Sequence, residues 1–182
     1  MRVITGSARG RKLKTLEGLD VRPTTDMVKE AVFTIIHFRV PYASMLDLFA
    51  GCGQMGIEAL SRGASRVVFV DRSRESQAVI KENLTTTGLM KQARVIADDA
   101  VSFLSHVSDK YDIIFLDPPY DEGYGPKILP LLEKALAPGG IVLFEHRYKE
   151  EFPETAGGLV RKKNYKYGKI AVTTYVHAED AQ

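Results

Sequence analysis

The feature that most constrains the fold is a repeated alternation of apolar runs and helical segments between residues 45 and 145. Three of the runs contain only apolar side chains: Val67–Val70, Ile113–Leu116 and Ile141–Phe144. Runs of this kind are typical of parallel strands that are covered on both faces. The alternation therefore predicts a doubly wound α/β domain with helices on both sides of a mostly parallel sheet.

The same pattern predicts where the individual elements lie. The expected strands are Met45–Ala50, Arg66–Asp71, Ala93–Ala97, Asp112–Asp117 and Gly140–Glu145. The expected helices between them are Met55–Arg62, Glu75–Thr86, Ala100–Ser105 and Ile128–Ala137, the last punctuated by Pro138-Gly139-Gly140. An earlier helix is expected after Asp26, with an apolar stripe made of Met27, Val28, Ala31, Val32, Ile35 and Ile36.

Both ends of the chain depart from the strand–helix alternation. Residues 159–166 and 169–177 read as two strands joined at Tyr167-Gly168, which predicts an antiparallel hairpin. Residues 2–5 and 11–16 flank two glycines and predict a small N-terminal β-hairpin. We therefore expect a Rossmann-like, seven-stranded sheet with an antiparallel C-terminal hairpin, divided into an extension (1–22) and a main domain (23–182).

Length and composition limit the classes of protein to which this chain can belong. The 182 residues suit one domain, and the 45% hydrophobic content suits an ordinary globular core. Cys52 is the only cysteine, and the four histidines lie at no metal-binding spacing, so neither a disulfide nor a metal site is expected. No apolar run approaches the roughly 18 residues that span a bilayer. Since no signal peptide is recognisable, we expect a cytoplasmic protein without membrane contact.

Basic side chains gather at two places. Residues 1–22 carry six Lys or Arg against two acids, and residues 161–169 carry five with no acid, although the whole chain has a net charge of only +2. Basic edges on an acidic body favour a polyanionic partner, and solvated edge strands are the alternative. The candidate contacts to such a polyanion are Arg9, Arg11, Lys12, Arg22, Lys162 and Lys163.

A glycine-rich loop follows the first expected strand. Gly51, Gly53 and Gly56 satisfy the G-x-G-x-x-G pattern, which provides a tight turn, close approach of backbone to a ligand, and close packing of helix on strand. Asp71 ends the next strand, where a carboxylate can accept hydrogen bonds from both ribose hydroxyls. Together they predict a site for an adenosine cofactor and leave open which one.

Two more acids bear on the choice of cofactor. Asp47 lies at the mouth of the first strand, where a carboxylate suits a cationic ligand such as S-adenosylmethionine better than a dinucleotide. Asp99 follows the third strand, at a place where it could accept a hydrogen bond from an adenine amino group.

The fourth strand ends in Asp117-Pro118-Pro119-Tyr120. The two prolines fix the backbone and have no N–H, so nearby carbonyls are left to accept from a ligand. In an open α/β sheet this end of the strand faces the ligand crevice. The tetrapeptide favours methyl transfer to an amino group on a base: Asp117 and the Pro118 carbonyl accept the two N–H bonds, and Tyr120 stacks on the unstacked base.

These motifs resemble those of class I S-adenosylmethionine-dependent amino-methyltransferases. The chain also carries five segments, in matching order, that are similar to those of the RsmD family: residues 9–13, 22–26, 29–33, 46–51 and 58–64. Members of that family methylate guanine N2 in bacterial 16S ribosomal RNA. The resemblance covers essentially the whole chain and implies S-adenosylmethionine as cofactor and 16S rRNA, or the small ribosomal subunit, as partner.

The resemblance also implies roles for individual residues. Asp117 to Tyr120 are placed at the target base, Asp71 at the ribose, and Asp99 with Ala100 at the adenine. The segment from Arg22 to Thr25 closes over the methionine end in related enzymes. The full set of expected cofactor contacts is Asp47, Phe49, Ala50, Gly51, Gly53, Asp71, Arg72, Asp99, Ala100 and Thr25.

Three other functions remain open from the residues alone. A DNA adenine-N6 or cytosine-N4 methyltransferase uses the same tetrapeptide, but this chain has no insertion long enough for a target-recognition domain. A dinucleotide-dependent oxidoreductase shares the glycines and Asp71 but leaves the tetrapeptide unexplained. A non-catalytic RNA-binding module would not need the acids of the cofactor loop. Glu145 and His146 are interpreted as a surface pair at a strand end.

Overall fold

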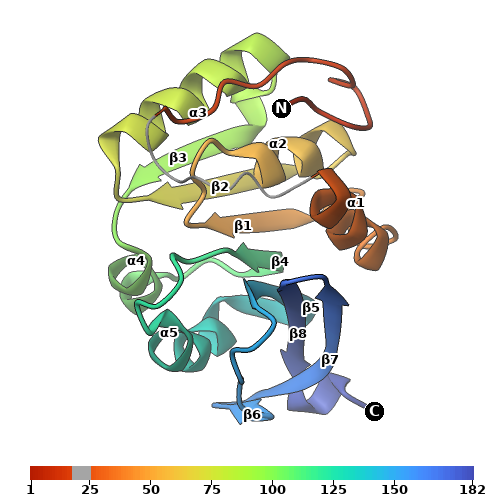
Figure 1. Cartoon of the computed structure of the whole chain (residues 1–182), viewed down its shortest axis with the longest axis vertical. Helices are drawn as coiled ribbons and strands as arrows, with labels where there is room; N and C mark the ends of the chain where they lie inside the picture. The colour runs from red at the N-terminus through yellow and green to blue at the C-terminus, as the bar shows by residue number, and fades with distance from the viewer. Residues whose placement is uncertain (18–25) are drawn as a thin grey trace.

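A computed structural model of the chain describes residues 1–17 and 26–182. Its centre is a sheet whose strands follow the order β3-β2-β1-β4-β5-β8-β7-β6 (Figure 1). The first five strands in this order pair in parallel, and the last four, from β5 on, pair antiparallel. The expected Rossmann-like, doubly wound sheet with an antiparallel C-terminal hairpin is confirmed, with eight strands where seven were expected.

The parallel strands lie close to where the apolar runs placed them. The strands are β1 (Ser44–Leu48), β2 (Arg66–Asp71), β3 (Ala93–Ala97), β4 (Tyr111–Leu116), β5 (Leu136–Arg147), β6 (Thr155–Ala156), β7 (Leu159–Tyr167) and β8 (Ile170–His177). The additional strand, β6, is only two residues long, too short to produce a periodic pattern. β1 ends before Ala50 because Phe49 has a left-handed backbone, with φ of 56°.

Most helices also agree with the expected ranges. The helices are α1 (Asp26–Ile35), α2 (Gln54–Ser61), α3 (Arg74–Thr87), α4 (Ala100–His106) and α5 (Tyr124–Leu132), with 3-10 turns at Met90–Gln92, Glu133–Ala135 and Ala178–Asp180. Within the described ranges, no helix has the length and apolar character needed to cross a membrane.

The expected helix Ile128–Ala137 is wrong at both ends. α5 begins earlier, at Tyr124, and β5 already begins at Leu136. The Pro138-Gly139-Gly140 segment lies inside β5, where the pairing with β4 jumps from Tyr111↔Leu136 to Ile113↔Ile141. This irregularity accommodates a proline and a glycine of positive φ within a strand, which the turn-like sequence concealed.

The side chains of the sheet divide into two hydrophobic cores. Ile113 and Phe115 of β4 face one core with α1, α2 and α3, whereas Ile114 and Leu116 face the other with α4 and α5. This alternation is the period of two expected of a strand buried on both faces. The carboxyl ends of β1 to β5 are therefore free to form a site between the helical layers.

The N-terminal segment differs from the expected β-hairpin. Arg2 and Lys12 form a single antiparallel bridge, and the turn between them is held by hydrogen bonds such as Val3 N–H to Arg11 O, 2.9 Å. Val3 and Leu13 pack into the core beneath α2 and α3. The segment makes few ladder bonds because its backbone bonds instead to side chains of those helices, for example Lys14 N–H to Asn83 Oδ1 at 2.8 Å. The boundary expected at residue 22 falls outside the described residues, so the division into two parts remains a prediction.

The apolar stripe of α1 is shifted from the expected one. The buried face is made of Val28, Lys29, Val32 and Phe33, whereas Met27 is 61% exposed. Lys29 was not expected inside, but its Nζ lies 3.8 Å from the buried carboxylate of Glu58. Burial lowers the pKa of Lys29, and Glu58 opposes that shift.

Candidate active site

The glycine loop follows β1 directly and opens α2. Gly51 and Gly53 have φ of 58° and 81°, and Gly53 is the residue before the first turn of α2. A Cβ atom on Gly56 would lie 2.3 Å from the Phe69 ring of β2. The three glycines therefore provide the tight turn and the close helix–strand packing that the motif predicts.

Asp71 connects the end of β2 to this loop. One carboxylate oxygen accepts the Gly51 N–H at 2.9 Å and the other accepts the Ser73 N–H at 2.9 Å. The side chain is half-buried at the mouth of the cleft. Each carboxylate oxygen can accept more than one hydrogen bond, so Asp71 is held in place and can still accept from a ligand's hydroxyl groups.

Asp47 lies beneath the loop, in β1. It is 2% exposed, and its Oδ2 accepts the Gly56 N–H at 3.0 Å. Burial raises the pKa of Asp47 well above its usual range, with smaller contributions from Asp71 and Asp117. In this arrangement Asp47 fixes the start of α2, and its expected contact with the cofactor remains a prediction.

The third acid of the cleft caps a helix. Asp99 precedes α4, and its Oδ1 accepts the N–H groups of Val101 and Ser102 at 2.9 and 3.2 Å. Asp98, beside it, accepts the Asp99 N–H at 2.8 Å. The N-cap role fixes the Asp99 carboxyl group at the cleft.

These elements enclose a cleft of about 620 Å³ at the carboxyl ends of the strands. Of the residues expected at a cofactor or target base, it is lined by Phe49, Gly51, Asp71, Arg72, Asp99, Ala100, Asp117, Pro118, Pro119 and Tyr120. Ala50 and Gly53 shape the loop through the bond from Gly53 N–H to Ala50 O, 2.8 Å, and are not part of the lining. Tyr124 was missed by the sequence reasoning; its ring meets Phe49 edge-on, with centroids 4.9 Å apart.

The tetrapeptide follows β4 and forms one wall of the cleft. Asp117 and Tyr120 are half-buried, and Tyr120 packs against the core that lies beneath α1. The Arg147 guanidinium lies over the Tyr120 ring, 4.8 Å from its centroid, and binds both Asp121 oxygens at 3.0 and 2.8 Å. Asp121 has a φ of 66°, so this ion pair ties a left-handed residue of the loop to the end of β5.

A second cavity, of about 390 Å³, lies beside the same loop. It shares Pro118, Pro119 and Tyr120 with the first cleft and extends to Glu145 and His146 at the end of β5. The interpretation of Glu145 and His146 as a surface pair is wrong, because they are 3% and 1% exposed. The antiparallel partner β8 covers this end of β5, a long-range contact that no local pattern revealed.

His146 has a structural role in that cavity wall. Its Nδ1 lies 2.8 Å from the Arg147 carbonyl oxygen, and its Nε2 lies 2.7 Å from Thr173 Oγ1. Burial lowers the pKa of His146. Nδ1 donates to the carbonyl oxygen, which can only accept, and Nε2 is occupied by Thr173, so His146 needs no catalytic function to explain it.

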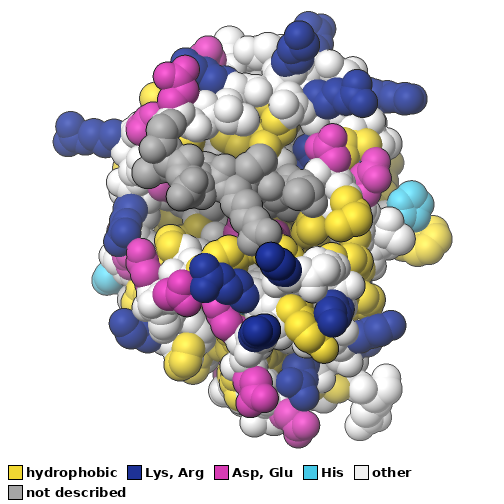
Figure 2. Space-filling view, viewed as in Figure 1, with side chains coloured by type: hydrophobic (Ala, Val, Ile, Leu, Met, Phe, Trp, Pro, Cys, Tyr) yellow, Lys and Arg dark blue, Asp and Glu magenta, His cyan; other side chains and the backbone are white. Residues whose placement is uncertain are grey.

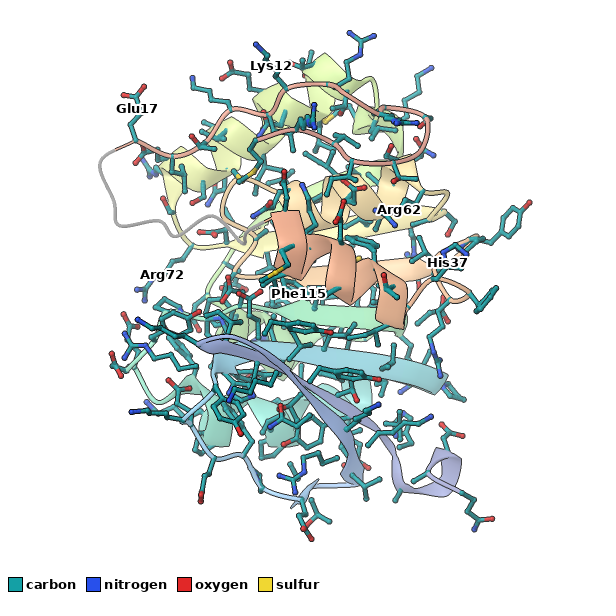
Figure 3. All side chains as sticks on the ribbon, turned by 45° about the vertical axis from the view of Figure 1, so that its right-hand side comes forward. Lys12, Glu17, His37, Arg62, Arg72 and Phe115 are labelled. Atoms are coloured by element: carbon teal, nitrogen blue, oxygen red, sulfur yellow. The ribbon has the colours of Figure 1, made fainter. Side chains whose placement is uncertain are left out.

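The basic residues expected at RNA lie on the surface. Arg9, Arg11 and Lys12 are exposed on the N-terminal segment, and Lys162 and Lys163 are exposed on β7. Figure 2 shows Lys and Arg side chains over the part of this face where β7 and β8 lie in Figure 1. Figure 3 shows Lys12 on the outer side of the N-terminal segment. Arg22 and Thr25 lie outside the described residues.

Comparison with known proteins identifies the family. The model of the family described as "Conserved hypothetical protein 95" matches residues 1–176. The chain belongs to this family. It is the RsmD family, so the resemblance carried by the sequence motifs is confirmed.

Similar proteins include two from well-known bacteria. A Bacillus subtilis (strain 168) protein named "Putative rRNA methyltransferase YlbH" is 43% identical over 181 residues, which covers 96% of this chain and 98% of that protein. The "Ribosomal RNA small subunit methyltransferase D" of Escherichia coli (strain K12) is 32% identical over 177 residues, covering 96% and 89%. Among solved structures, the "Putative methyltransferase yhhF" from Escherichia coli superposes with a TM-score of 0.87 at 30% identity, covering 97% of each chain.

Proposed function

We propose that the protein transfers a methyl group from S-adenosylmethionine to the exocyclic N2 amine of a guanine in 16S ribosomal RNA. The observation that carries this proposal is the wall shared by the two cavities. Pro118, Pro119 and Tyr120 border both the cleft beside the glycine loop and the cavity behind it. A methyl donor in the first and a base in the second would therefore meet at the tetrapeptide. The names of the relatives support ribosomal RNA as the substrate.

The residues of the larger cleft fit an adenosine cofactor. Backbone comes close to the cleft at Gly51, the Asp71 carboxylate is fixed at its mouth, and Asp99 and Ala100 stand at the opening of α4. The charged groups of the cleft suit a cation. Its described lining contains one basic residue, Arg72, and four acids: Asp71, Asp98, Asp99 and Asp117. S-adenosylmethionine carries a sulfonium methyl group that is activated for transfer to nitrogen.

The tetrapeptide prepares the accepting amine. The Asp117 carboxylate and the Pro118 carbonyl accept its two N–H bonds, which turns the nitrogen lone pair out of conjugation with the base. Bound S-adenosylmethionine would supply the methyl group to this nitrogen, with the electron pair of the C–S bond left on sulfur. The nitrogen then sheds one proton to Asp117, which passes it to water. Tyr120, whose ring is backed by the Arg147 guanidinium, supports the base by stacking.

Loss of the Asp71 carboxylate should weaken cofactor binding without unfolding the protein. Asp71→Ala removes up to two charge-assisted acceptors, each worth roughly 1.5–3 kcal/mol, and releases the Gly51 N–H that it holds. Calorimetry with S-adenosylmethionine should show an affinity at least tenfold weaker. An unchanged affinity, with circular dichroism like that of the parent protein, would exclude Asp71 from the ribose site.

The basic N-terminal segment should contribute phosphate contacts to RNA binding. Each phosphate contact makes log affinity fall more steeply with log salt concentration, by about 0.7 to 0.9 per contact. Replacing Arg9, Arg11 and Lys12 together by Gln should therefore reduce that slope by about two to three. If filter-binding titrations show the same slope of log affinity against log salt concentration for the variant, these residues are solvated surface without phosphate contacts.

The alternatives predict different products and ligands. A DNA adenine or cytosine methyltransferase would transfer label from S-adenosylmethionine to unmethylated duplex DNA. An oxidoreductase would be stabilised against heat by NAD or NADP rather than by S-adenosylhomocysteine. We expect stabilisation by S-adenosylhomocysteine alone and label in unmodified 16S rRNA or small subunits. Label in DNA with none in RNA would overturn the proposal.

A further inference from the structure

Glu145 is a buried acid at the site that the proposed reaction does not use. It lies near the carboxyl end of β5, is 3% exposed, and lines the second cavity with Pro118, Pro119 and Tyr120. Strand ends of this kind face the ligand crevice of an α/β sheet. A carboxylate at this position can recognise a ligand group that donates hydrogen bonds.

The strand register places Glu145 beside Asp117. β4 and β5 pair in parallel, with Phe115 opposite Leu143 and Leu116 opposite Phe144. The pairing ends there, and Asp117 is the next residue after β4. Continued by one residue, the register would set Asp117 opposite Glu145, with both on the face of Phe115 and Leu143 and the two strands about 4.8 Å apart. From this extension of the register we infer that the two carboxylates are neighbours, Asp117 lining the larger cleft and Glu145 the second cavity.

Two neighbouring acceptors match two neighbouring donors on a base. The Watson–Crick edge of guanine has the N1–H next to the N2 amine. In adenine and cytosine the ring nitrogen next to the amine is an acceptor, which an ionised carboxylate would repel. We propose that Glu145 accepts the N1–H of the guanine whose N2 amine is bound by Asp117, and that it thereby selects guanine. This inference rests on the proposed function.

The rest of the cavity is consistent with a base that presents donors. Among its described residues, the further charged side chains are the acids Asp121, Glu150 and Glu151, and Asp121 is paired with Arg147. Tyr120, Tyr124 and Phe152 supply aromatic faces. A site built from carboxylates and rings suits a flat base with N–H groups at its edge, and it does not suit a phosphate.

The test replaces the target guanine by 2-aminopurine, which keeps the 2-amine but has a bare acceptor at N1. Once the labelled nucleotide of 16S rRNA is mapped, RNA carrying either base at that position is given to the parent protein and to Glu145→Gln. The Gln amide can donate to N1 of 2-aminopurine, which a carboxylate cannot. Glu154→Gln is the matched control, because the Glu154 side chain is 86% exposed and lines neither cavity.

We expect the parent protein to methylate guanine at least tenfold faster than 2-aminopurine, in kcat/KM. Glu145→Gln should lower this ratio at least tenfold, partly by a gain with 2-aminopurine, and Glu154→Gln should leave it unchanged. A purely structural role of Glu145 would slow both substrates equally, and that result would overturn the proposal.

The two proposals fail in different ways. Equal rates of the parent protein on guanine and 2-aminopurine would refute the role of Glu145 while the proposed function stands, and this comparison decides the matter even if Glu145→Gln does not fold. If the parent protein methylates no guanine in unmodified 16S rRNA or small subunits, both are overturned.

Discussion

Asp117→Ala is expected to abolish methyl transfer while S-adenosylmethionine binding falls by less than about tenfold, or ~1.4 kcal/mol. The reason is that Asp117 follows β4 and lines the larger cleft, directly before the wall that both cavities share, where we propose that it acts on the amine. The Asp117 carboxylate accepts a hydrogen bond from the amine as the amine is prepared for attack. Its loss should therefore raise the activation barrier of methyl transfer and change the dissociation constant of S-adenosylmethionine little. Single-turnover rates and calorimetry measure the two quantities separately.

Two further variants sharpen this experiment. Asp117→Asn keeps one acceptor oxygen and should retain measurable activity, above that of Asp117→Ala. Asp112→Ala removes an exposed carboxylate at the opposite end of the same strand, where it accepts the Ser44 N–H at 2.8 Å. Asp112→Ala should leave kcat unchanged. Asp117→Ala working at nearly the parent rate would contradict the assignment.

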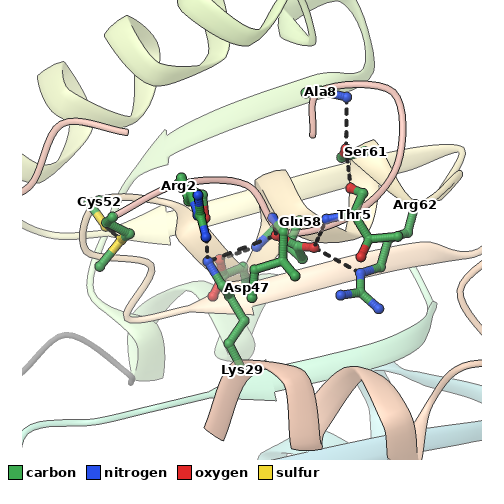
Figure 4. A network of polar contacts seen from close by, with 12 residues as sticks. Arg2, Thr5, Ala8, Lys29, Asp47, Cys52, Glu58, Ser61 and Arg62 are labelled. Atoms are coloured by element: carbon green, nitrogen blue, oxygen red, sulfur yellow. Dashed lines mark hydrogen bonds and ion pairs between the residues drawn. The ribbon is translucent and has the colours of Figure 1, made fainter. Parts of the chain in front are cut away.

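Glu58→Ala is expected to reduce the free energy of unfolding by about 3–5 kcal/mol, the usual cost of breaking a buried ion pair. Glu58 is fully buried in α2, where its carboxylate accepts the Ile4 and Thr5 N–H groups at 2.9 and 3.0 Å and the Arg62 Nε–H at 2.9 Å. It also pairs with buried Lys29, whose Nζ donates to the Arg2 carbonyl oxygen at 3.0 Å (Figure 4). The variant leaves Lys29 without its buried counter-charge and frees the N-terminal segment.

An exposed ion pair gives the matched control for this measurement. Lys14 and Glu82 lie 3.0 Å apart, with about half of each side chain exposed. Such pairs are worth roughly 0–1 kcal/mol, so Glu82→Ala should scarcely shift the urea midpoint. If Glu58→Ala were equally mild, the buried network would not anchor the N-terminal segment as we describe.

The sequence predicted best what depends on local pattern. Two examples are the apolar run that forms β2 and the glycine turn that opens α2. Each depends only on neighbouring residues, and each prediction was confirmed. The αL backbone of Gly53 and the tight contact between Gly56 and Phe69 follow from the motif itself.

What the sequence did not predict depends on contacts between distant segments. Lys29 is buried because Glu58 meets it across two helices, and Glu145 is buried because β8 returns to cover β5. The N-terminal residues form a single bridge because Asn83 and Glu58 take up backbone groups that a strand would have paired. None of these partners lies near its counterpart in the chain, so periodicity and turn signals could not reveal them.

The product nucleoside tests most directly whether this protein methylates guanine N2 in 16S rRNA, as we propose. The protein is incubated with methyl-labelled S-adenosylmethionine and, separately, unmodified small ribosomal subunits, unmodified 16S rRNA and unmethylated duplex DNA, and the digested nucleosides are identified by mass spectrometry. We predict label in N2-methylguanosine from a ribosomal substrate. Label in N6-methyladenine from the DNA, with none in the rRNA, would contradict the account.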